Sequence, residues 1–170
     1  SALAYAHENG VIHRDIKPSN IIMDGGRRPV LTDYGIARVL GATSHTVPGI
    51  VVGSAHYMSP EQAQGLPLDA RSDLYSLAVV LFEALTGRVP FGGETTMTVL
   101  MQHMTTPPPP VRSYNRLLPA GFDPTMARAL AKDPAHRYQN GAELGGALHA
   151  ALAEVAQAPT RVVERASIPD

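Results

Sequence analysis

Hydrophobic residues in the second half of the chain recur at helical spacing. Residues 71–85 are apolar on nearly every side, which predicts a helix buried at the centre of the fold. Residues 60–64 predict a short helix that begins at a proline and ends at Gly65. Three further helices are expected over residues 95–104, 122–131 and 140–155, the last of them capped by Asn140.

Apolar runs in the first third of the chain are shorter, and glycine and polar residues interrupt them. Residues 1–9 predict the end of a helix that Asn9-Gly10 stops. Residues 21–23 and 29–32 predict two strands that a glycine-containing turn joins into a small hairpin. The pattern as a whole therefore predicts a mainly α fold with a small β-hairpin element.

A polar octet at residues 13–20 precedes the first strand of this hairpin. Its two flanks, residues 11–12 and 21–23, predict short buried strands. The octet is then a loop held between rigid ends, where reactive side chains are usually placed. Residues 36–60 lack periodicity and predict a long surface loop, which in a compact domain is normally functional or disordered.

Composition excludes several classes of function. Lys and Arg total 14 against 15 Asp and Glu, and the net charge of -1 creates no field to attract nucleic acid or an anionic membrane. The absence of cysteine excludes disulfides and thiolate metal sites. The sequence contains no signal peptide and no run long enough to span a bilayer, so we expect a cytoplasmic domain, and a membrane anchor beyond residue 170 of the full-length protein stays open. The chain begins at Ser1, and its first residues look like the last turns of a helix. We therefore also expect an N-terminally truncated piece.

Asp15, Asn20 and Asp33 fall on or beside the short strands and are expected to converge on one point. Mg²⁺ prefers oxygen ligands and keeps several waters, so one or two protein oxygens plus substrate phosphates usually suffice. Asn20 and Asp33 supply such oxygens, which leaves Asp15 free to act as a general base. Lys17 can place an ammonium group on a phosphoryl group. Taken singly, each acid could equally be an ordinary turn or loop residue.

Five motifs give the chain a resemblance to a known family. HRDIKPSN at 13–20 is followed by DYG at 33–35, GSAHYMSPE at 53–61, DARSDLYSL at 69–77 and KDPAHRY at 132–138. Their order and spacing resemble the C-terminal lobe of eukaryotic-like protein kinases, and YMSPEQA and RSDLYSL look like those of bacterial Ser/Thr kinases.

This resemblance covers about residues 1–153. It divides them into a catalytic loop at 13–20, an activation segment at 33–61 and a helical part at 62–153. Residues 154–170 would then be a linker or tail.

The resemblance implies an enzyme that transfers the γ-phosphoryl group of ATP to Ser or Thr of protein substrates, with Mg²⁺ as the metal. Asp15 resembles the catalytic aspartate that orients the substrate hydroxyl, and Lys17 resembles the lysine that contacts the γ-phosphate. Asn20 and Asp33 match the Mg²⁺ ligands. No nucleic acid is expected as a partner, and the full-length protein could form a kinase homodimer.

Regulation is implied by a second group of residues. Arg14 matches the arginine that binds the phosphate group of a phosphorylated activation loop. A guanidinium can donate two hydrogen bonds to one phosphate, which stabilises this contact. The candidate acceptors are Thr43, Ser44 and Thr46, and an inert polar loop is the alternative. This group therefore implies autophosphorylation of the activation loop.

The resemblance also implies a platform for the protein substrate. Ser54 stands where the family usually has Thr, and its hydroxyl is expected to reach the catalytic aspartate and lysine. Glu61 and Arg137 match a buried ion pair that ties this platform to the helical lobe.

Two further residues are expected to support the catalytic loop. His13 would pack beneath the segment that carries Asp33. Asp73 matches a helix acid whose carboxylate receives backbone N–H groups of the loop. A plain acidic residue at a helix N-terminus is the alternative for Asp73.

The 170 residues contain no Gly-rich phosphate loop, no strand lysine paired with a helix glutamate and no hinge for adenine. We therefore expect this chain by itself to have little or no kinase activity, because it lacks half of the ATP site. Two other functions remain open, a pseudokinase scaffold that binds protein partners without catalysis and a Mg²⁺-dependent phosphohydrolase.

Overall fold

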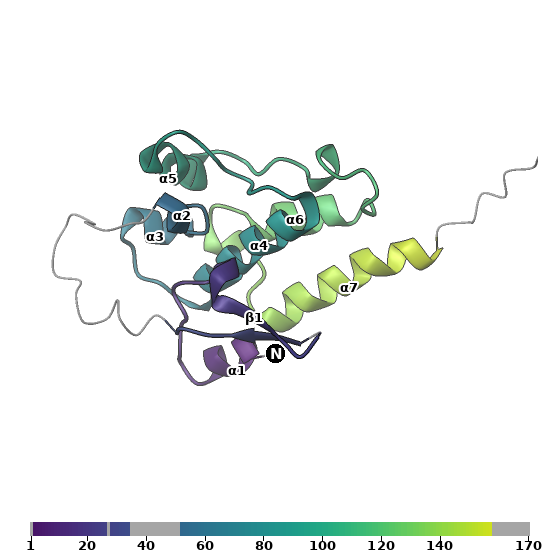
Figure 1. Cartoon of the computed structure of the whole chain (residues 1–170), viewed down its shortest axis with the longest axis horizontal. Coiled ribbons are helices and arrows are strands. Elements are labelled where there is room, and N and C mark those ends of the chain that lie inside the picture. The colour runs from purple at the N-terminus through teal and green to yellow at the C-terminus, as the bar shows by residue number, and fades with distance from the viewer. Residues whose placement is uncertain (1, 27, 35–51, 158–170) are drawn as a thin grey trace, which may run out of the picture.

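Helices make up most of the structure. A computed structural model describes residues 2–26, 28–34 and 52–157. The α-helices are α1 (Ala2–Glu8), α2 (Val52–Ala55), α3 (Pro60–Gln64), α4 (Ala70–Thr86), α5 (Thr96–Thr105), α6 (Phe122–Ala129) and α7 (Gly141–Gln157). The strands β1 (Ile21–Asp24) and β2 (Arg28–Leu31) form one antiparallel hairpin (Figure 1). The prediction of a mainly α fold with a small β-hairpin is confirmed.

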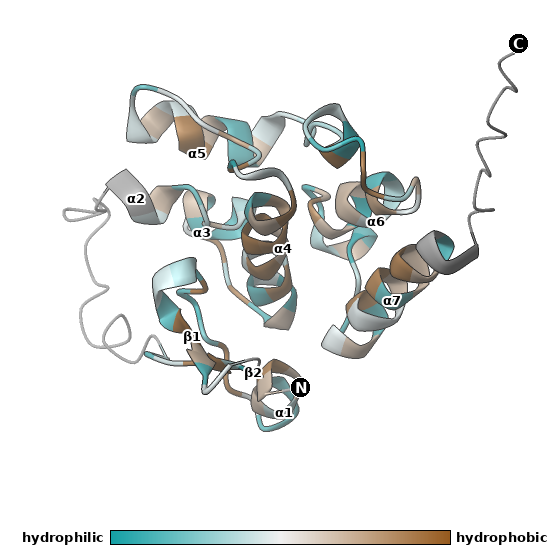
Figure 2. Ribbon diagram, turned by 45° about the vertical axis from the view of Figure 1, so that its right-hand side comes forward, coloured by the Kyte–Doolittle hydropathy of each residue, from teal (hydrophilic) through white to brown (hydrophobic). Residues whose placement is uncertain are grey.

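Helix α4 lies at the centre of the molecule, between the hairpin and the helices α5 and α6 (Figures 1 and 2). Eight of its residues are buried, among them Leu74, Tyr75 and Phe82. The helix begins where Asp69 accepts a hydrogen bond from the backbone of Arg71, and it ends at Gly87, whose φ of 75° suits a glycine. The nearly all-round apolar pattern of residues 71–85 therefore marks a central helix, as predicted.

The other predicted helices are also present: α3 has the predicted bounds, and the ends of the others differ from the prediction by at most two residues. Helix α3 starts with a capping box, because the side chains of Ser59 and Gln62 each bond the other residue's backbone. Gly65 ends it with a φ of 68°. Asn140 accepts a hydrogen bond from the backbone of Glu143 at 2.9 Å, which caps α7 as the sequence predicts.

The hairpin is less buried than its sequence suggests. Ile21 pairs with Leu31, and both pack against the core around α4. Ile22 and Met23, in contrast, are 56% and 58% exposed. The prediction of a buried strand at 21–23 was therefore wrong in its burial, because only the Ile21–Leu31 end of the hairpin packs against the core and the rest of both strands extends into solvent.

The predicted strand at residues 11–12 is also absent. Val11 instead completes the C-terminal cap of α1: its N–H donates to Ala6 O at 2.9 Å, and the N–H of Gly10 donates to His7 O at 3.0 Å. These are the two bonds of a Schellman motif, with Gly10 at a φ of 73°. The cap uses the amide that a strand would need, and Val11 is left 45% exposed.

Helices α1 and α7 pack together, and α3 packs against α5. Within residues 2–26, 28–34 and 52–157, no helix combines the length and the apolar character needed to cross a membrane. Asp33 and Tyr34 follow β2, and residues 35–51 lie outside the described part of the chain. This architecture places the 13–20 loop between α1, the hairpin and the start of α4.

Candidate active site

The carboxylate of Asp73 holds the backbone of the 13–20 loop. Its Oδ2 accepts the N–H of His13 at 2.8 Å, and its Oδ1 accepts the N–H of Arg14 at 2.9 Å. The imidazole of His7, on α1, lies 2.8 Å from the same carboxylate through Nε2. Asp73 is 1% exposed, so three polar partners surround a carboxylate that water barely reaches.

Arg14 has a φ of 69°, a left-handed conformation that is unusual for a residue with a side chain. The bond from its N–H to Asp73 and a bond from the Gln62 side chain to its carbonyl at 2.7 Å both fix this conformation. The Nε of Arg14 is buried and has no hydrogen-bond partner among the described residues. A partly buried arginine whose Nε lacks an acceptor fits an anion bound beside it.

His13 lies beneath the end of β2. Its Nε2 donates to the carbonyl of Thr32 at 2.9 Å, and its Nδ1 accepts the N–H of Asp15 at 3.3 Å. Its ring centroid is 4.6 Å from that of Tyr34. The imidazole is completely buried, and these contacts connect the residue before Asp33 to the backbone of Asp15.

The side chains of Asp15, Lys17 and Asn20 form one cluster. Lys17 Nζ donates to Asp15 Oδ2 at 2.8 Å, and Asn20 Nδ2 donates to the same oxygen at 3.2 Å and to the Asp15 carbonyl at 2.8 Å. No hydrogen bond within the described residues reaches the second carboxylate oxygen, Oδ1. The cluster is partly open to solvent, since about a quarter of the side chains of Lys17 and Asp15 is exposed.

Asp33 follows a segment whose backbone is bonded to this cluster, but no hydrogen bond or ion pair of the described residues connects its side chain to Asp15, Lys17 or Asn20. Thr32 donates its N–H to the carbonyl of Asn20 at 2.9 Å, which fixes the start of the Asp33 segment beside the 13–20 loop. Asp33 itself is exposed and has a φ of 56°. The oxygens of Asn20 and Asp33 are hard donors of the kind that Mg²⁺ prefers, so the residues present fit this metal.

The sequence profile of the protein kinase domain matches residues 1–139. The chain belongs to the protein kinase family. Among its relatives, the Ser/Thr protein kinase PrkC of Bacillus subtilis is 43% identical over 144 residues, which are 85% of this chain and 22% of PrkC. The Ser/Thr protein kinase PknB of Mycobacterium tuberculosis is 44% identical over 145 residues, 84% of this chain and 23% of PknB. This chain thus spans less than a quarter of the length of these curated relatives.

Solved kinase structures share this fold. A mutant form of the PknI kinase domain of Mycobacterium tuberculosis superposes with a TM-score of 0.64 and 28% identity, over 89% of this chain and 50% of that one. The twitchin kinase region of C. elegans gives a TM-score of 0.68 and 27% identity, over 86% of this chain and 25% of that one. The resemblance to bacterial Ser/Thr kinases found in the sequence is confirmed.

The segment before α3 of this kinase chain is fixed by side chains from several helices. The hydroxyl of Tyr57 donates to Glu83 of α4 at 2.7 Å, and burial together with this carboxylate raises the pKa of the phenol above its ordinary value. Ser54 lies in α2, and no hydrogen bond connects it to Asp15 or Lys17 in the described structure. The expected bond from Ser54 is therefore absent. The prediction of a surface loop at 36–60 was also wrong over 52–60, where α2 and the buried residues Ala55, Met58 and Ser59 lie.

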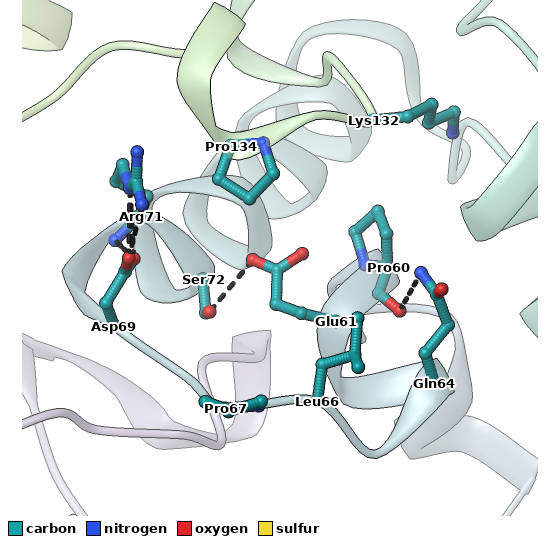
Figure 3. Close-up of a pocket in the computed structure, with 10 residues that line it drawn as sticks. All are labelled: Pro60, Glu61, Gln64, Leu66, Pro67, Asp69, Arg71, Ser72, Lys132 and Pro134. Carbon is teal, nitrogen blue, oxygen red and sulfur yellow. Dashed lines mark hydrogen bonds and ion pairs between the residues drawn. The ribbon is translucent and has the colours of Figure 1, made fainter.

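Glu61 lies at the start of α3 and is buried beneath it. Its Oε1 accepts the hydroxyl of Ser72 at 2.8 Å, as Figure 3 shows, and both oxygens bond the guanidinium of Arg137 at 2.6 and 2.8 Å. Burial acts to raise the pKa of Glu61, but the hydrogen bonds and charge of Arg137 outweigh it and hold this pKa below its usual range. The ion pair expected from the sequence is present.

A pocket of about 260 Å³ is lined by Glu61 and lies between Leu66 and Pro67 on one side and Pro134 on the other (Figure 3). The polar side chains drawn there are paired with each other or with backbone, as in the ion pair of Asp69 with Arg71. None of the residues that line the pocket belongs to the 13–20 loop. The pocket is therefore separate from the Asp15 cluster.

Three predicted site residues, Thr43, Ser44 and Thr46, lie outside the described residues. Two others that contact the site were missed in the sequence. His7 gives no local signal, since it lies 66 residues from Asp73. Gln62 was assigned only to a short helix, although its side chain both caps α3 and bonds the carbonyl of Arg14. Neither contact can be found from spacing, because both depend on how distant segments pack.

Proposed function

We propose that this chain is the catalytic C-terminal lobe of an active Ser/Thr protein kinase, which transfers the γ-phosphoryl group of ATP to Ser or Thr of protein substrates. The observation that carries the proposal is the arrangement around Asp15. One of its carboxylate oxygens is occupied by Lys17 and Asn20, and the other has no partner among the described residues. A scaffold that only binds partners has no need of such an arrangement.

Asp15 Oδ1 is the atom that would meet the substrate hydroxyl. A carboxylate oxygen that keeps its lone pairs can orient an attacking hydroxyl and take up its proton. Lys17 and Asn20 fix the direction of the carboxylate by binding Oδ2, and Asp73 fixes the backbone beneath it. The reacting oxygen is therefore positioned before substrate arrives, which reduces the orientational cost of transfer.

Asn20 and Asp33 would hold Mg²⁺, which neutralises charge on the phosphates of ATP when bound. Lys17 carries a positive charge within 2.8 Å of Asp15 and can stabilise the phosphoryl group as negative charge develops on it. We assign the chain to the cytoplasm, since this chemistry requires ATP and protein substrates.

Autophosphorylation of the activation segment is part of the proposal. The buried and unpaired Nε of Arg14 supports it, since a phosphate group on Thr43, Ser44 or Thr46 could supply the missing acceptors. The bonds with Asp73 and Gln62 fix the left-handed backbone from which the Arg14 side chain extends.

A chimera tests the proposal, because the 170 residues lack the Gly-rich loop and the lysine that complete an ATP site. This chain would replace the corresponding 144 residues of Bacillus subtilis PrkC, and transfer of ³²P from Mg-ATP to a Ser/Thr-containing protein would be measured. We expect transfer by the chimera and none by the isolated chain. The Asp15→Asn variant of the chimera should lose at least a thousand-fold in rate while ATP binding stays within about two-fold.

Unmodified PrkC is the positive control, and thermal melting shows whether each chimera is folded. A folded chimera that binds ATP but transfers no phosphate would overturn the proposal and favour the pseudokinase scaffold. An Asp15→Asn chimera with an unchanged rate would overturn the role assigned to Asp15.

A further inference from the structure

His103 is a fully buried polar residue on α5, outside the Asp15 cluster. Its Nε2 lies 3.0 Å from the carbonyl oxygen of His56, and its Nδ1 lies 2.9 Å from the hydroxyl of Tyr75. A carbonyl can only accept, so Nε2 carries the hydrogen. Nδ1 then accepts the hydroxyl hydrogen of Tyr75, and the imidazole is a neutral ring in one tautomer.

The surroundings of the ring keep it neutral and in place. Phe91 packs edge-on with its centroid 4.9 Å from that of His103, and Tyr75 packs edge-on at 5.7 Å. Burial lowers the pKa of His103 to about 4, and the nearby positive charge of Lys132 adds to this effect. Lys132 itself donates to the carbonyl of Gln102 at 3.1 Å and lies 4.0 Å from the Phe91 centroid.

His56 lies in the segment between α2 and α3, which belongs to the substrate platform (residues 54–61). The next two amides, of Tyr57 and Met58, bond back to the carbonyls of Ser54 and Ala55, so they turn the chain without anchoring it to another helix. The carbonyl of His56 points away to α5 and bonds His103. This bond attaches the backbone of the platform to a helix that is 47 residues away in the sequence.

The far end of the platform is attached to the same place. Glu61 bonds Arg137, whose guanidinium lies 4.8 Å over the ring of Tyr75. Tyr75 therefore supports both attachments, since its hydroxyl bonds His103 and its ring carries Arg137. Tyr75 and His103 are both completely buried, so neither contact competes with water.

We propose that His103 is a positioning residue for the protein substrate, because its imidazole fixes the His56 carbonyl and so sets the course of the substrate platform relative to α4 and α5. This inference rests on the proposed kinase function. It assigns to α5 a part in substrate binding that acts through the backbone of the platform, without contact with ATP.

Three variants separate this role from ordinary core packing. His103→Phe keeps an aromatic ring but removes both hydrogen bonds. His103→Gln restores a donor near the position of Nε2 and should rescue the bond to His56. Tyr75→Phe removes the bond to Nδ1, together with the 3.4 Å bond from Lys132 Nζ to the same hydroxyl, and leaves the donor that reaches the platform.

The first measurement uses the 170-residue chain by itself. Hydrogen exchange of a peptide covering 54–61 should become at least ten-fold faster in His103→Phe and change less than three-fold in His103→Gln and Tyr75→Phe, with α7 as the internal reference. Long-range ¹⁵N NMR of the unsubstituted chain should show the Nε2–H form of His103 down to pH 5. Equal exchange in His103→Phe and the unsubstituted chain would overturn the proposal. An NMR spectrum that shows the Nδ1–H form of His103 would also overturn it. If His103→Phe does not fold, the NMR result and the two other variants still test the proposal.

The second measurement uses the PrkC chimera. His103→Phe should raise KM for the protein substrate at least five-fold and leave KM for ATP within two-fold, and His103→Gln should restore most of the loss. Equal effects on both KM values, or none, would overturn the substrate-positioning role. If even the unsubstituted chimera transfers no phosphate, it is the proposed function that fails, and the exchange experiment still decides whether His103 holds the platform.

Discussion

Glu61 and Arg137, 76 residues apart in the sequence, form two charge-assisted hydrogen bonds of 2.6 and 2.8 Å inside the protein. The side chain of Arg137 is 1% exposed and that of Glu61 is 7% exposed. Three backbone carbonyls, of Ala131, Lys132 and Arg71, accept the remaining hydrogens of the guanidinium. Both charges are thus fully paired, which is the condition under which a buried ion pair is tolerated.

Removing one partner of this pair should strongly destabilise the chain. We expect Arg137→Met to lower the free energy of unfolding by about 3–5 kcal/mol, because it leaves the Glu61 carboxylate buried without a counterion. Urea unfolding followed by circular dichroism measures this. The matched control is Arg71→Met, which breaks the exposed ion pair with Asp69 and should cost no more than about 1 kcal/mol. Equal losses in the two variants would contradict the prediction.

Replacing Asp73 by Asn should loosen the catalytic loop. The substitution keeps the shape of the side chain but removes the charge and one of the two acceptors that bind the N–H groups of His13 and Arg14. We expect a loss of roughly 3 kcal/mol in stability, since hydrogen bonds to charged groups contribute about 1.5–3 kcal/mol each. Hydrogen exchange of residues 13–16 should accelerate more than that of α7, and uniform acceleration would argue for a general packing defect.

Stability should fall between neutral and acidic pH because of His103. Its pKa is about 4 in the folded chain and 6.5 in the unfolded chain, so the unfolded state binds the proton first as the pH drops. The stability that the neutral His103 ring contributes is fully present above about pH 6.5. It is lost as the pH falls toward 4, by roughly 3 kcal/mol over this range. Of the groups that face the ring, Lys132 stays mostly protonated below pH 7, and the pKa of Tyr75 is raised far above this range by burial. His56 accepts through its carbonyl, and positive charge on its own ring acts further against protonation of His103.

Thermal melting of the unsubstituted chain and of His103→Phe at pH 7 and pH 4.5 measures this effect. The variant should lose clearly less stability over this range than the unsubstituted chain. Parallel losses in the two proteins would show that another group causes the acid sensitivity.

The PrkC chimera should phosphorylate its own activation segment. After incubation with Mg-ATP, mass spectrometry is expected to find phosphate on Thr43 or Thr46. Arg14→Gln should reduce the activation that follows by at least ten-fold, since it removes the guanidinium whose buried Nε lacks an acceptor. Thr43→Ala with Thr46→Ala is the control that removes the acceptors. Modification confined to sites outside 36–60 would contradict this prediction.

Many features of this kinase chain could be predicted from local sequence. The helix around residues 71–85, the caps at Gly65 and Asn140, and the hairpin all depend on residues within a few positions of one another, where backbone geometry fixes the spacing. The family was also visible, since the order of five short motifs is specific enough to identify a protein kinase. The apolar run at 21–23 gave a wrong prediction of burial, because Ile22 and Met23 are exposed.

The sequence by itself thus determined the main helices, the hairpin, the family and the identity of the polar residues in the 13–20 loop. Only the tertiary structure decided which distant groups are in contact. Asp73 accepts the N–H groups of His13 and Arg14, which are 60 and 59 residues away in the sequence, and His103 bonds the carbonyl of His56. The physical reason is that local spacing sets backbone conformation and the apolar face of each helix, whereas a hydrogen bond between distant residues exists only once packing has brought both groups within about 3 Å.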